Sequence, residues 1–320
     1  MDNHSGAIKI ASWFLLLTSI SVVTVCSLTR WRLFRENLLP FALLLSTLIS
    51  SIISGACISL SATHGLGTSL SPSTSLPGIQ KALYISDLFY ILTLGFGKLA
   101  VVAFFHMLLS GTGQIQITIL VQGFLILWTA SMFIAASLQC RPPEVWDLVS
   151  GRCIHTRSLW TYSSTSNILI ETLLILVPSI IIFRLHMPLR KRVLVVACFS
   201  FRALDILVSS IQLHYLHAFD SQTPVPVDLW PWVICSQVLQ TTTIVSACVP
   251  YLREFLEAFP SGMLRPAGEA GSGGTGGNGG SASGEGVKGG RYQVYFLRQG
   301  RDVELEGWEG RGGMSLFSRD

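Results

Sequence analysis

ALYISDLFYILTLGFGKLAVVAFFHMLL, which runs from Ala82 to Leu109, is long and apolar enough to cross a bilayer as one helix. A helix needs about 20 mostly apolar residues to span a hydrocarbon core of roughly 30 Å. Only Asp87 and Lys98 in this stretch carry a full charge. The stretch therefore predicts a transmembrane helix whose two charges face protein rather than lipid.

Six further stretches of the chain have the same length and character. Of the 320 residues, 50% are hydrophobic and only 12% are charged, whereas soluble domains carry about 25% charged residues. The first apolar run exceeds the roughly 7–15 residues of a signal peptide core, so we expect it to be retained. The seven predicted spans are about 8–28, 38–62, 82–109, 115–138, 163–185, 193–217 and 229–252. The sequence therefore predicts an all-α membrane protein, with residues 1–257 forming one seven-helix bundle.

The distribution of Lys and Arg in the connecting segments favours an amino terminus outside the cell. Cytoplasmic segments of membrane proteins are enriched in these residues. With the amino terminus outside, nine bases fall on the cytoplasmic side and five on the other. The nine are Arg30, Arg32, Arg35, Arg184, Arg190, Lys191, Arg192, Arg253 and Arg265, and the five are Lys9, Lys81, Arg141, Arg152 and Arg157.

The segment after the bundle has a different composition. From Leu264 to Gly290 it is dominated by glycine and serine and has too few apolar residues to form a core. We expect residues 258–320 to be a disordered, Gly-rich cytoplasmic tail. RYQVYFLRQGRDVELEGW, from Arg291 to Trp308, alternates weakly around a Gln-Gly turn, so a partner-binding hairpin is the alternative there.

Five ionisable residues fall within the predicted spans and are the candidate site residues: Asp87, Lys98, Glu171, Arg202 and Asp205. An ionisable group at the bilayer centre costs at least ~2.5–3.5 kcal/mol, so each should face the bundle interior. Asp87 and Lys98 share one face of their helix about 16 Å apart, and Arg202 can pair with Asp205 three residues later. We place Asp87 and Glu171 toward the outer leaflet and the other three near mid-depth.

Two interpretations of these charges remain open. They could line a polar cavity that opens to the outside, floored by Lys98 and walled by Asp87 and Glu171, which would hold a small polar ligand. Alternatively, they could be structural ion pairs that lock the helices together.

The sequence argues against several function classes. A retinal-binding rhodopsin needs a Schiff-base lysine in its seventh helix, but the lysines lie at positions 9, 81, 98, 191 and 288. There is no H-E-x-x-H, G-x-S-x-G or Walker motif, and no His or Cys spacing typical of a metal site. The bases do not alternate with aromatic residues as in a nucleic-acid-binding module. We therefore predict no enzymatic activity, no cofactor, no metal and no nucleic-acid partner.

The connection between the fourth and fifth spans, LQCRPPEVWDLVSGRCI from Leu138 to Ile154, holds Cys140 and Cys153. In the predicted topology this loop is extracellular, where disulfides persist. A bridge would close a short ring and contribute ~3 kcal/mol. Free thiols are the alternative, and the remaining cysteines lie within spans as small packing residues.

Several motifs resemble those of the fungal rhodopsin-domain integral membrane proteins, which include Pth-type receptor-like proteins and the satratoxin-cluster membrane protein. The matching residues are Cys140-Arg141-Pro142, Trp146 and Gly151-Arg152-Cys153 in the loop, Asp87, Tyr90 and Lys98 in the third span, and Asn167, Glu171 and Pro178 in the fifth. Two further matches are FRLHMPLRKR at 183–192 and SACVPYLREF at 246–255. The resemblance covers roughly Ile8 to Glu257 and implies a seven-helix protein of the fungal plasma membrane.

The chain departs from the family pattern at three places. Phe105-His106-Met107 stands where the family usually has an arginine pair, Arg202-Ala203 where a glycine is frequent, and Gln237 where a glutamate is common. The first departure concerns the cytoplasmic end of the third span. It puts in doubt any signalling role that the family's arginine pair has there.

The leading functional hypothesis is a receptor-like membrane protein that senses an extracellular cue. Its partners would be the lipid bilayer, an unidentified small-molecule ligand and a heterotrimeric G protein. A signalling surface could form from Arg190, Lys191, Arg192 and Arg253, although the positive-inside rule alone also accounts for these bases. The alternative is a transporter or accessory membrane protein of a secondary-metabolite pathway, with Lys98, Glu171 and Asp205 on the translocation path.

Overall fold

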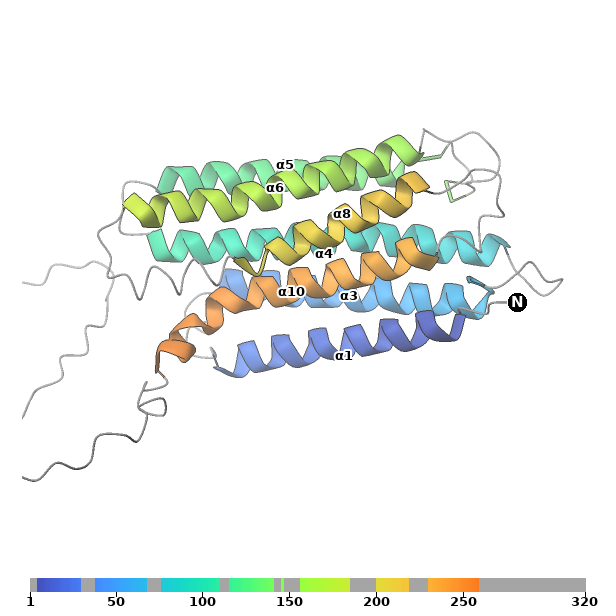
Figure 1. The fold of residues 1–320 in the computed structure, drawn as a ribbon, viewed down its shortest axis with the longest axis horizontal. Coiled ribbons are helices and arrows are strands. Elements are labelled where there is room, and N and C mark those ends of the chain that lie inside the picture. The colour runs from blue at the N-terminus through green and yellow to red at the C-terminus, as the bar shows by residue number, and fades with distance from the viewer. Residues whose placement is uncertain are drawn as a thin grey trace, which may run out of the picture. The chain divides into compact units, whose positions relative to one another are not determined.

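The computed structural model describes residues 5–29, 38–67, 76–109, 115–140, 145–146, 156–184, 200–218 and 230–258. Within these ranges the chain forms seven helices (Figure 1). They are α1 (Ser5–Thr29), α3 (Leu38–Thr63), α4 (Leu76–Leu109), α5 (Ile115–Ser137), α6 (Thr156–Arg184), α8 (Ala203–Ala218) and α10 (Trp230–Ala258). The predicted all-α membrane bundle is confirmed, and the proposed tail beyond residue 258 lies outside the described residues.

Six of the seven helices are long and apolar enough to cross a membrane. The exception is α8, which has 16 residues and begins at Ala203, after a turn at Phe201 and Arg202. Residues 193–199 of the predicted sixth span lie outside the described ranges. Helices α4 and α6 begin at Leu76 and Thr156, earlier than the predicted spans. Hydropathy detects only the part of a helix that lies in the hydrocarbon core of the membrane. It therefore misses the more polar first turns, which lie at the membrane interface.

Helix α4 lies at the centre of the bundle. It packs against α3, α5 and α10, while α6 packs against α8 and α1 packs against α3 and α10 (Figure 1). In the most apolar 18-residue stretch of α4, 67% of the residues are buried, compared with 28% in the corresponding stretches of α1 and α5. The central position of α4 explains why this helix can carry charged residues.

The outer surface of the bundle is apolar and its interior is partly polar. Leu120 and Leu127 on α5 are 73% and 70% exposed, and Leu169 on α6 is 64% exposed. The interior instead contains many buried serines, threonines and glutamines. This distribution suits helices that are surrounded by lipid and held together by polar contacts.

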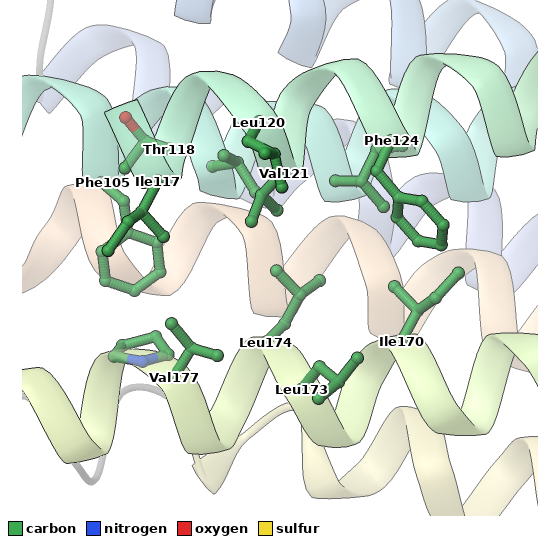
Figure 2. A pocket seen from close by; sticks show the side chains of 13 residues that line it. Phe105, Ile117, Thr118, Leu120, Val121, Phe124, Ile170, Leu173, Leu174 and Val177 are labelled. Carbon is green, nitrogen blue, oxygen red and sulfur yellow. The ribbon is translucent and has the colours of Figure 1, made fainter. Parts of the chain in front are cut away.

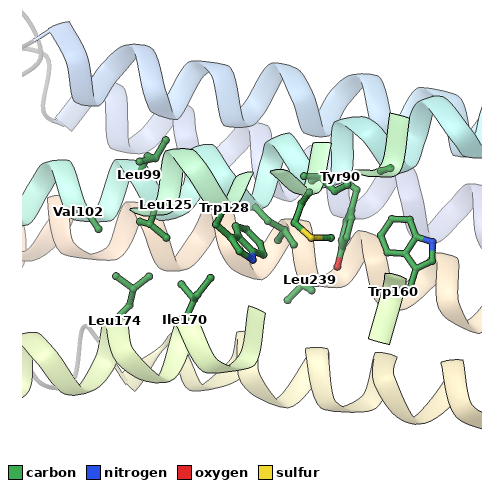
Figure 3. Packing of buried hydrophobic residues seen from close by; sticks show 13 residues of the cluster. Tyr90, Leu99, Val102, Leu125, Trp128, Trp160, Ile170, Leu174 and Leu239 are labelled. Carbon is green, nitrogen blue, oxygen red and sulfur yellow. The ribbon is translucent and has the colours of Figure 1, made fainter. Parts of the chain in front are cut away.

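Apolar clusters fill the space between these polar contacts. The cluster in Figure 3 joins Leu99 of α4, Leu125 and Trp128 of α5, Ile170 of α6 and Leu239 of α10. The cluster packs α4 against α5, α6 and α10.

Two glycines let neighbouring helices approach α4 closely. A Cβ atom added at Gly95 would lie 2.4 Å from Thr129 Cγ2 on α5, and one added at Gly97 would lie 2.5 Å from Thr243 Cγ2 on α10. Small residues of this kind at helix interfaces are typical of membrane bundles. Gly97 brings α10 close to the turn of α4 that carries Lys98, and Gly95 brings α5 close to the same helix.

Candidate functional site

A buried carboxylate, Glu171 on α6, is shared by two cations. Lys98 Nζ on α4 lies 2.9 Å from Glu171 Oε1, and Arg202 Nη1 donates a hydrogen bond to Glu171 Oε2. All three side chains have 0% exposure. Because an unpaired charge in such an environment is strongly unfavourable, the three groups stabilise one another as a unit.

Further contacts hold Lys98 to α5 and α6, and Asn167 links it to α8. The Lys98 Nζ donates a hydrogen bond of 2.5 Å to Asn167 Oδ1 on α6. Asn167 Nδ2 in turn donates a hydrogen bond of 2.8 Å to Ser209 Oγ on α8. The same Nζ lies 5.6 Å from the centroid of the Trp128 ring on α5, within the range of a cation–π interaction. Asn167 and Glu171 are four residues apart, so one face of α6 supplies both polar partners of Lys98.

The backbone changes course at the second cation of the cluster. A turn at Phe201 and Arg202 interrupts the helical conformation between Ser200 and Ala203. The amide of Asp205 donates to the carbonyl of Arg202 at 3.1 Å, an i→i−3 bond that starts α8. Of the two turn residues, Arg202 is fully buried, whereas Phe201 is 49% exposed.

Arg202 in the turn and Asp205 in the first turn of α8 reach different helices. Arg202 pairs with Glu171 of α6, while Asp205 Oδ2 accepts a hydrogen bond of 3.0 Å from Ser246 Oγ on α10. Within the described ranges, no ion pair joins Arg202 to Asp205, so the local pair that we predicted is not formed. The prediction assumed a continuous helix, whereas Arg202 lies in the turn before α8.

A buried polar stripe on α10 extends from this cluster, with a residue every three positions. Its members are Gln237, Gln240, Thr243 and Ser246, each at most 3% exposed. Gln240 Nε2 donates to Ser54 Oγ on α3 at 3.1 Å. Gln240 Oε1, Thr243 Oγ1 and Asp205 Oδ1 have no hydrogen-bond partner among the described residues. Such atoms favour small polar guests such as water.

Asp87 lies apart from the other four candidate residues. It is eleven residues before Lys98 on α4, or about 16 Å along the helix axis. One turn further on, the Tyr90 hydroxyl donates a hydrogen bond of 3.0 Å to Gln212 Oε1 on α8. The ring centroids of Tyr90 and Trp160 lie 6.1 Å apart. The ring centroids of Trp160 and Trp232 lie 5.6 Å apart. Asp87 therefore lies one turn from Tyr90, whose ring forms an aromatic cluster with Trp160 and Trp232, and not at the ion cluster.

The depth predicted for Glu171 was wrong. The residue lies near the middle of α6, because the helix begins at Thr156 rather than at residue 163. Glu171 is consequently level with Lys98 instead of lying nearer the outer leaflet.

Of the two interpretations that the sequence left open, an open cavity and structural ion pairs, the arrangement of four of the charges matches the second. Lys98, Glu171, Arg202 and Asp205 all have 0% exposure. A cavity of about 330 Å³ does occur, but it lies between α4, α5 and α6 and is lined by none of the five candidate residues (Figure 2).

The outer loop is described only in part. Lys81 Nζ lies 4.8 Å from the ring centroid of Trp146, which attaches this part of the loop to α4. Cys140 is buried, whereas Cys153 lies outside the described residues, so their disulfide stays a prediction. Cys26, Cys57, Cys235 and Cys248 lie within the helices and are not joined in disulfides.

The predicted signalling surface is almost entirely outside the described residues. Arg190, Lys191 and Arg192 belong to residues 185–199, for which no structure is given. Arg253 lies on α10, where only the backbone is described. The structure therefore does not test this surface.

The comparisons with known proteins identify the family. The family model of the fungal rhodopsin domain matches residues 27–258, well over half of the chain. The chain belongs to the fungal rhodopsin domain family. The searches of curated proteins and of solved structures gave no match.

The fungal rhodopsin domain contains the whole ion cluster. Residues 27–258 include α3 to α10 and therefore all four buried charges. The family resemblance read from the motifs is confirmed, whereas the match does not define a ligand. Sequence analysis did not identify the polar stripe of α10, although its three-residue spacing of Gln, Gln, Thr and Ser was visible.

Proposed function

We propose that this fungal rhodopsin domain is a receptor-like membrane protein that senses an extracellular cue and transmits it through movement of its helices. The observation that carries the proposal is the sharing of Glu171 by Lys98 and Arg202. This carboxylate connects α4, α6 and the start of α8 through contacts that are entirely buried.

A cluster of this kind favours two discrete helix arrangements over a continuous range. Moving α8 away from α6 would separate Arg202 from Glu171 and leave both charges in an apolar surrounding, which is costly unless new partners form. A ligand shifts such an equilibrium only by the difference in its affinity for the two states. The cluster is thus the proposed switch, and the ligand acts on helices that meet at it.

The proposed ligand contact is the aromatic cluster near Asp87, on the outer half of α4. Tyr90, Trp160 and Trp232 offer ring faces, and Asp87 offers a carboxylate without a hydrogen-bond or ion-pair partner among the described residues. Aromatic faces beside a carboxylate suit a small cationic or amphipathic molecule. A disulfide between Cys140 and Cys153 would fix the loop over this end of the bundle.

The proposal extends to location and partners. We place the protein in the plasma membrane and assign coupling to a heterotrimeric G protein at its basic cytoplasmic segments. It includes no catalysis, since the chain lacks the motifs of the enzyme classes considered above. It also includes no retinal, because α10 contains no lysine and Lys98 is held by Glu171 and Asn167.

The test is the basal rate at which a purified fungal G protein exchanges its nucleotide beside the reconstituted chain in nanodiscs. Glu171→Gln should change this rate several-fold, because it weakens the switch without any ligand. Leu127→Ala, on the lipid-facing side of α5, is the control and should match the unmodified chain. An unchanged rate in Glu171→Gln, with the variant folded, would refute coupling through this cluster.

Transport is the second candidate function. It is favoured by the turn at Phe201 and Arg202, because interrupted membrane helices frequently form substrate or ion sites in transporters. Proteoliposomes loaded with a pH-sensitive dye test this possibility directly. A proton flux that Lys98→Ala abolishes, together with no G-protein response, would replace the receptor proposal.

A further inference from the structure

An elongated cavity of about 330 Å³ separates α5 from α6 against the side of α4 (Figure 2). Val121 and Phe124 line it from α5, Leu174 and Val177 line it from α6, and Phe105 lines it from α4. Figure 2 shows these side chains facing one another across the space between the two helices. The volume is within the range of ordinary ligand sites in proteins, roughly 300–1,000 Å³.

The wall of the cavity offers hydrocarbon and almost nothing else. Thr118 is its single residue with a polar side chain. The hydroxyl of Thr118 lies 3.1 Å from His106 Nδ1, in a hydrogen bond with α4. Water would find no partners along such a wall, so an apolar guest is favoured.

The cavity opens toward the lipid. Leu120 and Phe124 on α5 line it and are 73% and 51% exposed, and Leu173 on α6 is 49% exposed. Both helices are candidate membrane spans. The opening therefore continues the apolar outer surface of the bundle and faces the interior of the bilayer.

The dimensions fit one hydrocarbon chain. The α5 lining runs from Ile117 to Leu125, which corresponds to about 12 Å along a helix. If a methylene group is taken to be similar in size to a water molecule, at about 30 Å³, the volume holds a chain of roughly ten carbons. A whole helix of a second protein is about 10 Å wide and would not enter.

We propose that this cavity binds one acyl chain of a bilayer lipid as a resident part of the fold. The chain fills the space between α5 and α6 and extends from the leaflet next to the α4–α5 connection. Ile170 and Leu174 line the cavity on either side of Glu171 in the sequence. The bound chain would therefore hold in place the helix that supplies the central carboxylate, whether or not the protein signals.

The test uses nanodiscs of phosphatidylcholine in which a fraction of the acyl chains carries a photoreactive diazirine. After illumination, peptide mass spectrometry should place most lipid adducts on the cavity walls of α5 and α6. Val121→Trp and, from the opposite wall, Val177→Phe should each lower these adducts at least about fivefold. Leu127→Trp, which adds the same bulk on the lipid side of α5 outside the cavity, should leave them unchanged.

Three results would overturn the proposal. One is adducts spread evenly over exposed residues of α1 and α5, as expected of lipid that merely surrounds the protein. Another is adducts on the cavity walls that persist in both filling variants, each shown to be folded by its thermal unfolding transition. The third is crosslinks between two protein copies through these residues, which would make a second copy the occupant.

Discussion

Replacing Glu171 by glutamine tests the physical core of this structure. The substitution keeps the shape of the side chain and removes its charge. Before the change, Lys98 and Arg202 are both paired with Glu171, and Asp205 is the second buried carboxylate of the cluster. Afterwards the cluster holds two buried cations and one buried carboxylate, and Lys98 keeps the side-chain carbonyl of Asn167 and the Trp128 ring as partners among the described residues.

The size of the effect follows from complete burial. Removing one partner of a buried ion pair costs about 3–5 kcal/mol, because the charge that remains is uncompensated. The double variant Lys98→Met/Glu171→Gln removes one charge of each sign and leaves one buried cation, Arg202, and one buried carboxylate, Asp205. We expect it to regain about 2 kcal/mol relative to the sum of the single variants, in the range seen for directly coupled residues.

The assay is thermal unfolding in nanodiscs of fixed lipid composition, followed by tryptophan fluorescence. At about 2–4 °C per kcal/mol, Glu171→Gln should lower the midpoint by on the order of 10 °C. Asp87→Asn is the matched control, because Asp87 makes no ion pair among the described residues, and it should shift the midpoint by at most about 2 °C. The reasoning fails if both variants behave alike, or if the effects of Lys98→Met and Glu171→Gln simply add.

Three further outcomes are expected. Gly97→Ala should destabilise the bundle by about 1–3 kcal/mol, since the new Cβ would lie 2.5 Å from Thr243 Cγ2. Adding Thr243→Ser should restore most of the lost stability. The control Gly123→Ala, whose new Cβ would have nothing within 4 Å, should leave the midpoint of the same unfolding assay unchanged. Tyr251→Phe should cost about 1 kcal/mol, because it removes the 2.6 Å hydrogen bond from the buried hydroxyl to the carbonyl of Ala100; an unchanged midpoint would contradict this. Incubation with all-trans retinal should produce no protein-bound visible absorption band, and a band that survives washing would contradict the exclusion of retinal.

The sequence was sufficient to predict the helices and to select the charges. A charged side chain in contact with lipid is so unfavourable that the five charges within apolar stretches were expected to face the bundle interior. Four of them are indeed fully buried and lie in one cluster. What the sequence could not supply was their pairing. The partner of Arg202 depends on a turn at positions 201 and 202, and nothing in the apolar run around them indicates a break.

The shape of the site was also beyond the sequence. The same charges could have lined an open cavity, and only their complete burial shows that they close on one another. The cavity between α5 and α6 likewise depends on how far two apolar helices separate. Residues such as Val121 and Leu174 look the same in a sequence whether they touch each other or a guest.

The most direct test of the seven-helix arrangement is the side of the membrane on which each end of the chain lies. An epitope tag is placed before Met1 in one version and after Asp320 in another, and antibodies are applied to intact and to permeabilised protoplasts. Seven crossings with the amino end outside predict that intact cells stain for the first tag and that the second needs permeabilisation. Staining of both tags under the same condition would mean an even number of crossings, such as the six clear spans without α8, and would contradict the account.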